Sequence, residues 1–132
     1  MKECVVVRGG KPFSGRQGLS YFEGVSAESA GAQGLCMHVL EMPPRAEALP
    51  HLHEAHETAI LVLSGRARMR YGEGLSEEIE VGEGDFLYIP AGMPHQPFNP
   101  GDQSCRAVVA RTDPNEQESV VLLDESGRRP AP

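Results

Sequence analysis

The chain has 132 residues, with 12 Lys and Arg against 19 Asp and Glu, so its formal net charge is −7. This length predicts one domain over residues 1–132, which can bury enough surface to fold without a disulfide or a structural metal. The acidic balance argues against nucleic acid as a partner, because nucleic-acid-binding modules concentrate positive charge. No uncharged stretch suits a membrane span and no signal-peptide core follows Met1, so we expect a cytoplasmic protein with no membrane partner.

The backbone is interrupted too often for long helices, because the chain contains 15 Gly and 11 Pro. The segment Thr58–Leu63 is apolar and rich in β-branched residues, as strands are. We therefore predict an all-β fold with little helix. Cys4, Cys36 and Cys105 are far apart and form no C-x-x-C pair, so we expect reduced and mostly buried thiols.

Short strands separated by turn signals are predicted along most of the chain. In order they are Cys4–Arg8, Leu19–Val25, Leu35–Met42, Glu57–Leu63, Arg66–Tyr71, Glu78–Val81, Phe86–Pro90 and Cys105–Arg111. Strands at this spacing, joined by tight turns such as Ser64-Gly65, predict an antiparallel sandwich or barrel. Every second residue of Arg66–Tyr71 is an arginine, which predicts one face toward solvent and one toward the core.

The chain becomes polar after Arg111 and then contains one short apolar run, Val120–Leu123. We expect this run to dock on the barrel or on a second subunit, and residues 124–132 to form a flexible tail. Exposed strand edges pair readily, so either this run or Cys4–Val7 would favour a homodimer.

Three of the chain's five histidines lie within six positions. The five are His38, His51, His53, His56 and His95. On a strand His51 and His53 point to one face, and Glu57 shares that face if the strand is regular, so two imidazoles and a carboxylate could meet at one metal ion. The alternative is a polar loop with solvated histidines. His38, in an apolar strand, is predicted to be a core residue.

A second segment favours the metal site over the loop. In residues 84–99 a strand enters a Pro-Ala-Gly turn that delivers His95 to the start of the next strand. This segment resembles the second motif of the cupin superfamily, G-x5-P-x-G-x2-H-x3-N. The matching residues are Gly84, Pro90, Gly92, His95 and Asn99.

The segment before it resembles the first cupin motif through His51, His53, Glu57 and Gly65, so that the resemblance spans about residues 35–111. It departs in two places: Arg45 replaces the leading glycine, and seven residues separate Glu57 from Gly65 where the motif has six. Counted back from Gly65, the carboxylate position falls on Thr58. His56 is a further candidate, since some small cupins resemble this chain but use a fourth histidine.

The resemblance implies a single cupin domain, a jelly-roll β-barrel of two antiparallel sheets. It also implies that His51, His53, Glu57 and His95 bind one divalent metal inside the barrel. The donor set suits Fe, Mn, Ni, Co, Cu or Zn, and it does not choose among them. Four protein ligands would leave coordination positions for a small molecule.

We therefore hypothesise a metal-dependent enzyme whose substrate is a small organic acid, enol or catechol-like molecule. Dioxygenase chemistry is the first expectation, and isomerisation or decarboxylation is the second. The alternative is a small-molecule binding or sensor module that uses the metal as an anchor without catalysis. No catalytic residue beyond the metal ligands is assigned from the sequence.

Overall fold

The computed structural model describes residues 3–115 and 119–130 of the chain. Nearly all of its regular structure is β. The strands are β1 (Pro12–Ser14), β2 (Ser20–Val25), β3 (Cys36–Met42), β4 (His51–His53), β5 (Thr58–Ser64), β6 (Arg66–Tyr71), β7 (Glu77–Gly82), β8 (Phe86–Ile89), β9 (His95–Phe98), β10 (Cys105–Arg111) and β11 (Val120–Leu122). Two short helical turns interrupt them, α1 (Ala27–Ala30) and a 3-10 turn at Glu73–Leu75.

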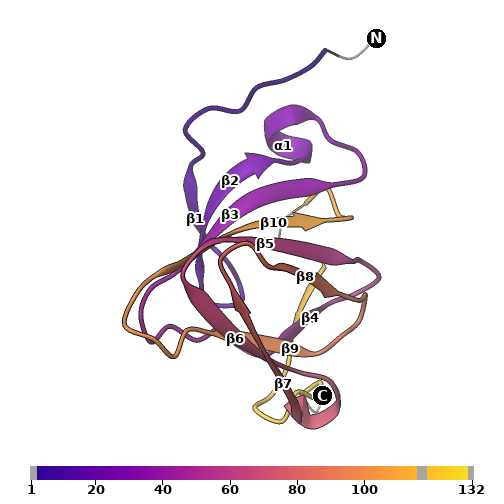
Figure 1. Cartoon of the computed structure of the whole chain (residues 1–132). Helices are drawn as coiled ribbons and strands as arrows, with labels where there is room; N and C mark the ends of the chain where they lie inside the picture. The colour runs from indigo at the N-terminus through magenta and orange to yellow at the C-terminus, as the bar shows by residue number, and fades with distance from the viewer. Residues whose placement is uncertain (1–2, 116–118, 131–132) are drawn as a thin grey trace.

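The strands form two antiparallel sheets that face each other (Figure 1). One has six strands in the order β1-β2-β3-β10-β5-β8, and the other has five in the order β11-β4-β9-β6-β7. This is the predicted all-β class, with the two-sheet arrangement of a jelly-roll barrel. Every described strand pair is antiparallel, as the tight turns in the sequence indicate.

Alternate side chains of the six-stranded sheet point into the space between the sheets. In β10 the buried positions are Cys105, Ala107, Val109 and Arg111, and β3 contributes an equivalent inward row. His38 belongs to that row and is 2% exposed, with its ring edge-on to Tyr21. It is thus the predicted core residue, and the two buried cysteines, Cys36 and Cys105, lie in the same layer.

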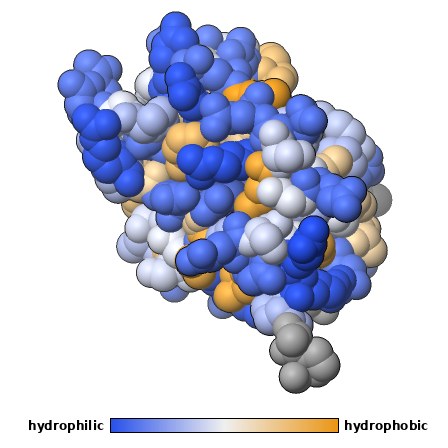
Figure 2. All heavy atoms as spheres, turned by 90° about the horizontal axis from the view of Figure 1, so that it is seen from below, coloured by the Kyte–Doolittle hydropathy of each residue, from blue (hydrophilic) through white to orange (hydrophobic). Residues whose placement is uncertain are grey.

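The outer face of the five-stranded sheet is charged. Arg66, Arg68 and Arg70 of β6 point outward and form ion pairs with Glu80 and Glu78 of β7. Figure 2 views the molecule from this side and shows mostly hydrophilic atoms, with hydrophobic ones in small patches between them. The alternation in Arg66–Tyr71 therefore identifies the wet and buried faces of β6 correctly. No helix in the described part of the chain is long and apolar enough to cross a membrane.

The sequence prediction is wrong for the first residues of the chain and is confirmed for the apolar run near its end. Residues Cys4–Arg8 form no strand, because this segment extends away from the barrel and meets no neighbouring strand there (Figure 1). Val120–Leu122, by contrast, pairs with β4 as β11, so the apolar run docks on the barrel of its own chain. Residues 124–130 form a turn in which Asp124 accepts hydrogen bonds from Ser126 and Arg128, while 131–132 lie outside the described residues.

Candidate metal centre

Three histidines meet at one end of the space between the sheets. His51 and His53 are alternate residues of β4, so their rings lie on one face of that strand. His95 begins β9, the neighbouring strand, and its Cα pairs with that of His51. All three are about 3% exposed, and one ligand atom from each lies within 4.8 Å of the others. This is close to the spacing of ligands round a single ion, because each metal–nitrogen bond is about 2.0–2.1 Å long.

In each of the three rings the Nδ1 atom forms a hydrogen bond within the protein. Nδ1 of His51 lies 2.7 Å from the carbonyl oxygen of Leu49, and Nδ1 of His95 lies 2.9 Å from that of Met93. Nδ1 of His53 lies 3.3 Å from the hydroxyl of Ser119. A carbonyl oxygen can only accept, so Nδ1 of His51 and His95 carries the proton and Nε2 keeps its lone pair. Outer contacts of this kind orient histidines that bind metal.

The protein environment keeps all three imidazoles neutral. Burial lowers the pKa of His95 to about 4, with a further lowering by Arg111. Burial also lowers the pKa of His53 and of His51 well below the ordinary value, and the neighbouring histidines and Arg111 add to the effect. A neutral imidazole is the form that coordinates a cation, so the site holds its donors in the binding form at neutral pH.

Glu57 is not part of this cluster. The chain turns at Glu54–Ala55, where Ala55 has a φ of 62°, so the strand does not run regularly from His53 to Glu57. Glu57 precedes β5 and is exposed, and its carboxylate accepts a hydrogen bond of 2.6 Å from the hydroxyl of Tyr88. Thr58 takes the inward position that follows the histidines, and it is 2% exposed.

His56 also lies outside the cluster. Its ring is partly exposed, with Nδ1 2.9 Å from the carbonyl oxygen of Thr112 and Nε2 3.9 Å from a carboxylate oxygen of Asp113. These contacts hold the turn between β4 and β5 against the end of β10. Within the described residues, the cluster that could hold a metal ion is therefore made of histidines alone.

The remaining motif residues shape the backbone around the histidines. The N–H of Gly92 donates to the carbonyl oxygen of His53 at 3.0 Å, which joins the two motif segments directly. The buried amide of Asn99 donates to the carbonyl oxygens of Met42, Pro43 and Gln103. Arg45, which replaces the motif's leading glycine, adopts a φ of 66°, the left-handed region that favours glycine.

Gly65 is needed for close packing rather than for chemistry. A Cβ atom at this position would lie 2.4 Å from the carbonyl oxygen of Ser104, and the residue has a φ of 81°. Any side chain would therefore push the β5–β6 turn away from Ser104 and from the start of β10. The turn sets where β6 starts, and with it one wall of the barrel.

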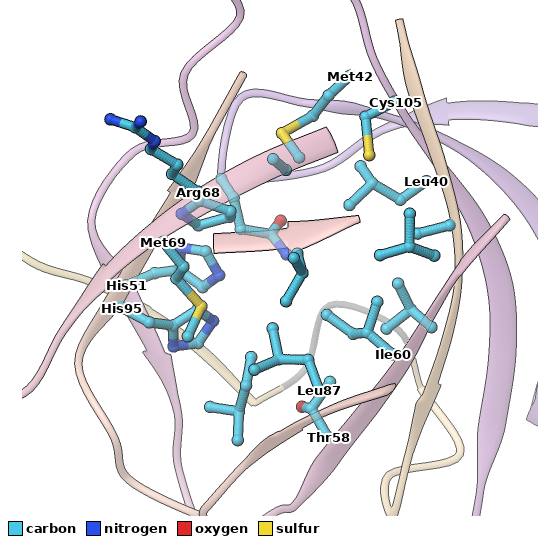
Figure 3. A pocket seen from close by; sticks show the side chains of 18 of the residues that line it. Leu40, Met42, His51, Thr58, Ile60, Arg68, Met69, Leu87, His95 and Cys105 are labelled. Carbon is cyan, nitrogen blue, oxygen red and sulfur yellow. The ribbon is translucent and has the colours of Figure 1, made fainter. Parts of the chain in front are cut away.

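The histidines line one side of a cavity that is otherwise mostly apolar (Figure 3). Leu40, Ile60 and Leu87 line the side away from His51 and His95, while the guanidinium of Arg68 points away from the centre. The space open to the centres of water molecules is about 50 Å³, which is room for a few water-sized groups. The polar residues of the lining, besides the histidines, are Gln17, Tyr21, Thr58, Arg68, Cys105 and Arg111. Sequence reasoning missed Gln17, which lies in a turn with no motif around it.

The family of the chain follows from a comparison with known domains. A family model described as a cupin domain matches residues 38–111, more than half of the chain. The chain belongs to the cupin family. This confirms the resemblance, and cupins often bind a divalent metal of the kind that three clustered histidines can hold. An uncharacterised protein of Methanocaldococcus jannaschii, MJ1618, is 29% identical over 83 residues, which are 63% of this chain and 64% of that protein.

Solved structures of other proteins share the cupin fold. The polyketide cyclase RemF of Streptomyces resistomycificus superposes with a TM-score of 0.71 and 26% identity, over 96% of this chain and 90% of that one. The oxalate decarboxylase of Bacillus subtilis gives a TM-score of 0.75 and 21% identity, over 90% of this chain but 31% of that one. The first likeness spans nearly both whole chains, whereas the second shows the fold alone.

Proposed function

We propose that this cupin is a metal-dependent enzyme that acts on a small oxygen-containing organic molecule, with dioxygenase-like chemistry as the leading reaction. The observation that carries the proposal is the buried cluster of His51, His53 and His95, whose Nε2 atoms remain available. A first-row divalent ion held there would supply Lewis acidity and, for iron, manganese or copper, redox chemistry with dioxygen. The imidazoles suit iron, manganese, nickel, cobalt, copper or zinc.

The composition of the cluster supports an exchangeable site. Three protein donors leave more positions for outside ligands than the four implied by the sequence resemblance, because Glu57 lies elsewhere. A site that must accept both an organic molecule and dioxygen needs such positions side by side. The apolar lining then limits the access of bulk water to the reacting groups.

The rest of the cavity argues for oxygenation over isomerisation. Isomerisation by proton transfer needs a general base whose pKa lies near the working pH. Among the described lining residues there is no Asp or Glu. Burial raises the pKa of Tyr21 and of Cys105. Both groups therefore stay protonated at neutral pH and cannot accept a proton from the substrate. A reaction in which the protein orients the substrate and keeps water out fits this lining better.

Cyclisation is a second candidate, because the cyclase RemF matches nearly the whole chain. A metal that polarises a carbonyl group would favour attack by a nearby carbon of the same substrate, without oxygen. The alternative of a binding module without catalysis requires only the metal anchor and the cavity. One assay distinguishes both alternatives from an oxygenase.

The deciding experiment loads the protein with iron(II) or manganese(II) and supplies a panel of diketones, catechols and hydroxy acids. Oxygen uptake is followed with an electrode, and products are identified by mass spectrometry. An oxygenase consumes oxygen and forms an oxygenated or cleaved product, and the His95→Ala variant loses both. Conversion without oxygen would favour cyclisation, isomerisation or decarboxylation. Binding without conversion under every metal would favour the binding module.

We also propose that a second copy of the chain covers the β8 edge of the six-stranded sheet. β8 is an edge strand, and its Phe86 and Tyr88 are 80% and 58% exposed. Two identical edge strands can pair antiparallel about a two-fold axis, which would bring the aromatic side chains of both copies side by side on the outer face. Light scattering after size-exclusion chromatography should give a dimer for the native chain and a monomer for Phe86→Ser. A monomeric native chain would contradict this.

A further inference from the structure

Gln17 is a buried polar residue that no motif accounts for. It lies in the turn between β1 and β2, is 1% exposed, and lines the same cavity as the three histidines. Its Oε1 atom has no hydrogen-bond partner among the described residues. Buried amides are almost always satisfied, so one beside the cavity whose oxygen has no partner requires a reason. Residue 17 also lies outside the region matched by the cupin model, so it is a feature of this chain.

The amide is held in one place by its surroundings. A Cβ atom on Gly15 would lie 2.6 Å from Oε1 of Gln17 and 2.3 Å from the ring of Tyr21, so only glycine leaves room there. Oε1 is thus covered by the turn and the tyrosine ring. The NH2 group is the part of the amide left to meet the cavity, where it can donate hydrogen bonds.

The backbone connects this amide to the histidine cluster. The carbonyl oxygen of Gln17 accepts a 2.6 Å hydrogen bond from the N–H of Leu49, and the carbonyl oxygen of Leu49 lies 2.7 Å from Nδ1 of His51. One residue therefore positions both the Gln17 turn and a candidate metal ligand. A donor held this firmly relative to the histidines can select among ligands by where their oxygens lie.

We propose that Gln17 is the specificity-determining residue of the cavity, and that its NH2 group donates to an oxygen of a substrate whose other oxygens face the histidines. This rests on the proposed function, in which a metal on the histidines holds one end of the substrate. The substrate class is a small molecule with two separate oxygen groups, one to chelate and one to accept from Gln17. The small volume and the apolar lining leave little room for anything larger at this depth.

The test compares two small chelators on cobalt(II)-loaded protein. Oxalate and acetohydroxamate both chelate through two oxygens, but oxalate presents further oxygens on its far side and acetohydroxamate presents a methyl group. Dissociation constants come from the visible spectrum of cobalt. In Gln17→Leu, which keeps the volume but removes the donor, we expect oxalate to bind about tenfold more weakly and acetohydroxamate to bind within a factor of two of the native value. Gln33→Leu, the same change at an exposed position, should alter neither.

A second measurement reads the amide itself in the unmutated protein. The side-chain NH2 signals of Gln17 in a proton–nitrogen correlation spectrum, assigned by their loss in Gln17→Leu, should shift when oxalate is added to zinc-loaded protein. Equal weakening of both chelators in Gln17→Leu, or unshifted NH2 signals with oxalate bound, would overturn the inference. Metal uptake is measured first, because a protein that takes up no metal refutes the proposed function. The NH2 signals of Gln17 are then followed as oxalate is added to the metal-free protein: a shift supports the role of Gln17, and unshifted signals overturn it.

Discussion

His51 and His95 lie opposite each other in the β4–β9 pair, and the centroids of their rings are 4.2 Å apart. His53, two residues further along β4, has its ring centroid 5.5 Å from that of His95. The three donors thus come from two adjacent strands whose register determines their spacing. Three residues provide all the clustered ligand atoms among the described residues, so a metal held there would depend on each of them.

Replacing one of these histidines should remove the metal without unfolding the protein. We expect His95→Ala to weaken zinc or cobalt binding by at least 100-fold, whereas Glu57→Gln and His56→Ala bind as the native chain does, since neither side chain faces the cluster. Metal content by mass spectrometry and competition with a chelating dye give the affinities. A large loss in Glu57→Gln would show that the carboxylate reaches the metal after all.

A carboxylate at position 58 should strengthen the site. Thr58 occupies the inward position and lines the same cavity as the three imidazoles, so Thr58→Glu would add a longer side chain with an anionic oxygen donor to that lining. We expect about tenfold tighter binding of manganese(II), which prefers oxygen ligands. Thr58→Gln, with the same shape and no charge, is the control. Equal affinities for the two variants would contradict the inward placement.

The metal-free protein should lose stability in acid. The pKa of His38 is lowered to about 3 and that of His95 to about 4, both mainly by burial. Between these pKa values and about pH 6.5 the unfolded chain binds protons that the folded chain cannot bind. The free energy of unfolding therefore decreases as the pH is lowered, by roughly 1.4 kcal/mol per pH unit for each histidine. Denaturant titrations from pH 7 to pH 4 measure the slope. His38→Leu removes two ring nitrogens that have no hydrogen-bond partner among the described residues, and it should reduce this slope by the share of one histidine.

Asn99 should matter for folding rather than for metal binding. Its side-chain nitrogen donates to three backbone carbonyl oxygens, and its Oδ1 accepts from the N–H of Gly101. Asn99→Ala would leave these buried groups unpaired, at a cost of about 2–4 kcal/mol in the free energy of unfolding. Urea denaturation measures this, with Gln103→Ala as an exposed control. Loss of metal from a variant of native stability would show a direct role in the site instead.

Local patterns in the sequence were sufficient for the fold class and for the histidines. Alternation with a period of two puts His51 and His53 on one face whatever the rest of the chain does, and the Pro-Ala-Gly turn leaves His95 at the start of the next strand. Gly92 in that turn likewise meets a local backbone need, because its φ is 73° and a Cβ atom there would have no neighbour within 4 Å. These features depend on residues close together in the chain.

Long-range packing decided the rest of the site. Whether Glu57 or Thr58 faces inward depends on a turn at Ala55 and on the pairing of β5 with β10, and a shift of one residue exchanges the two faces of a strand. Gln17 enters the cavity only because its turn is bonded to Leu49, which is 32 positions away in the printed sequence. The sequence alone determined the fold class, most of the longer strands and the clustering of the histidines. Only the tertiary structure decided which other side chains share their cavity, because strand register and contacts between distant turns arise from packing across the whole barrel.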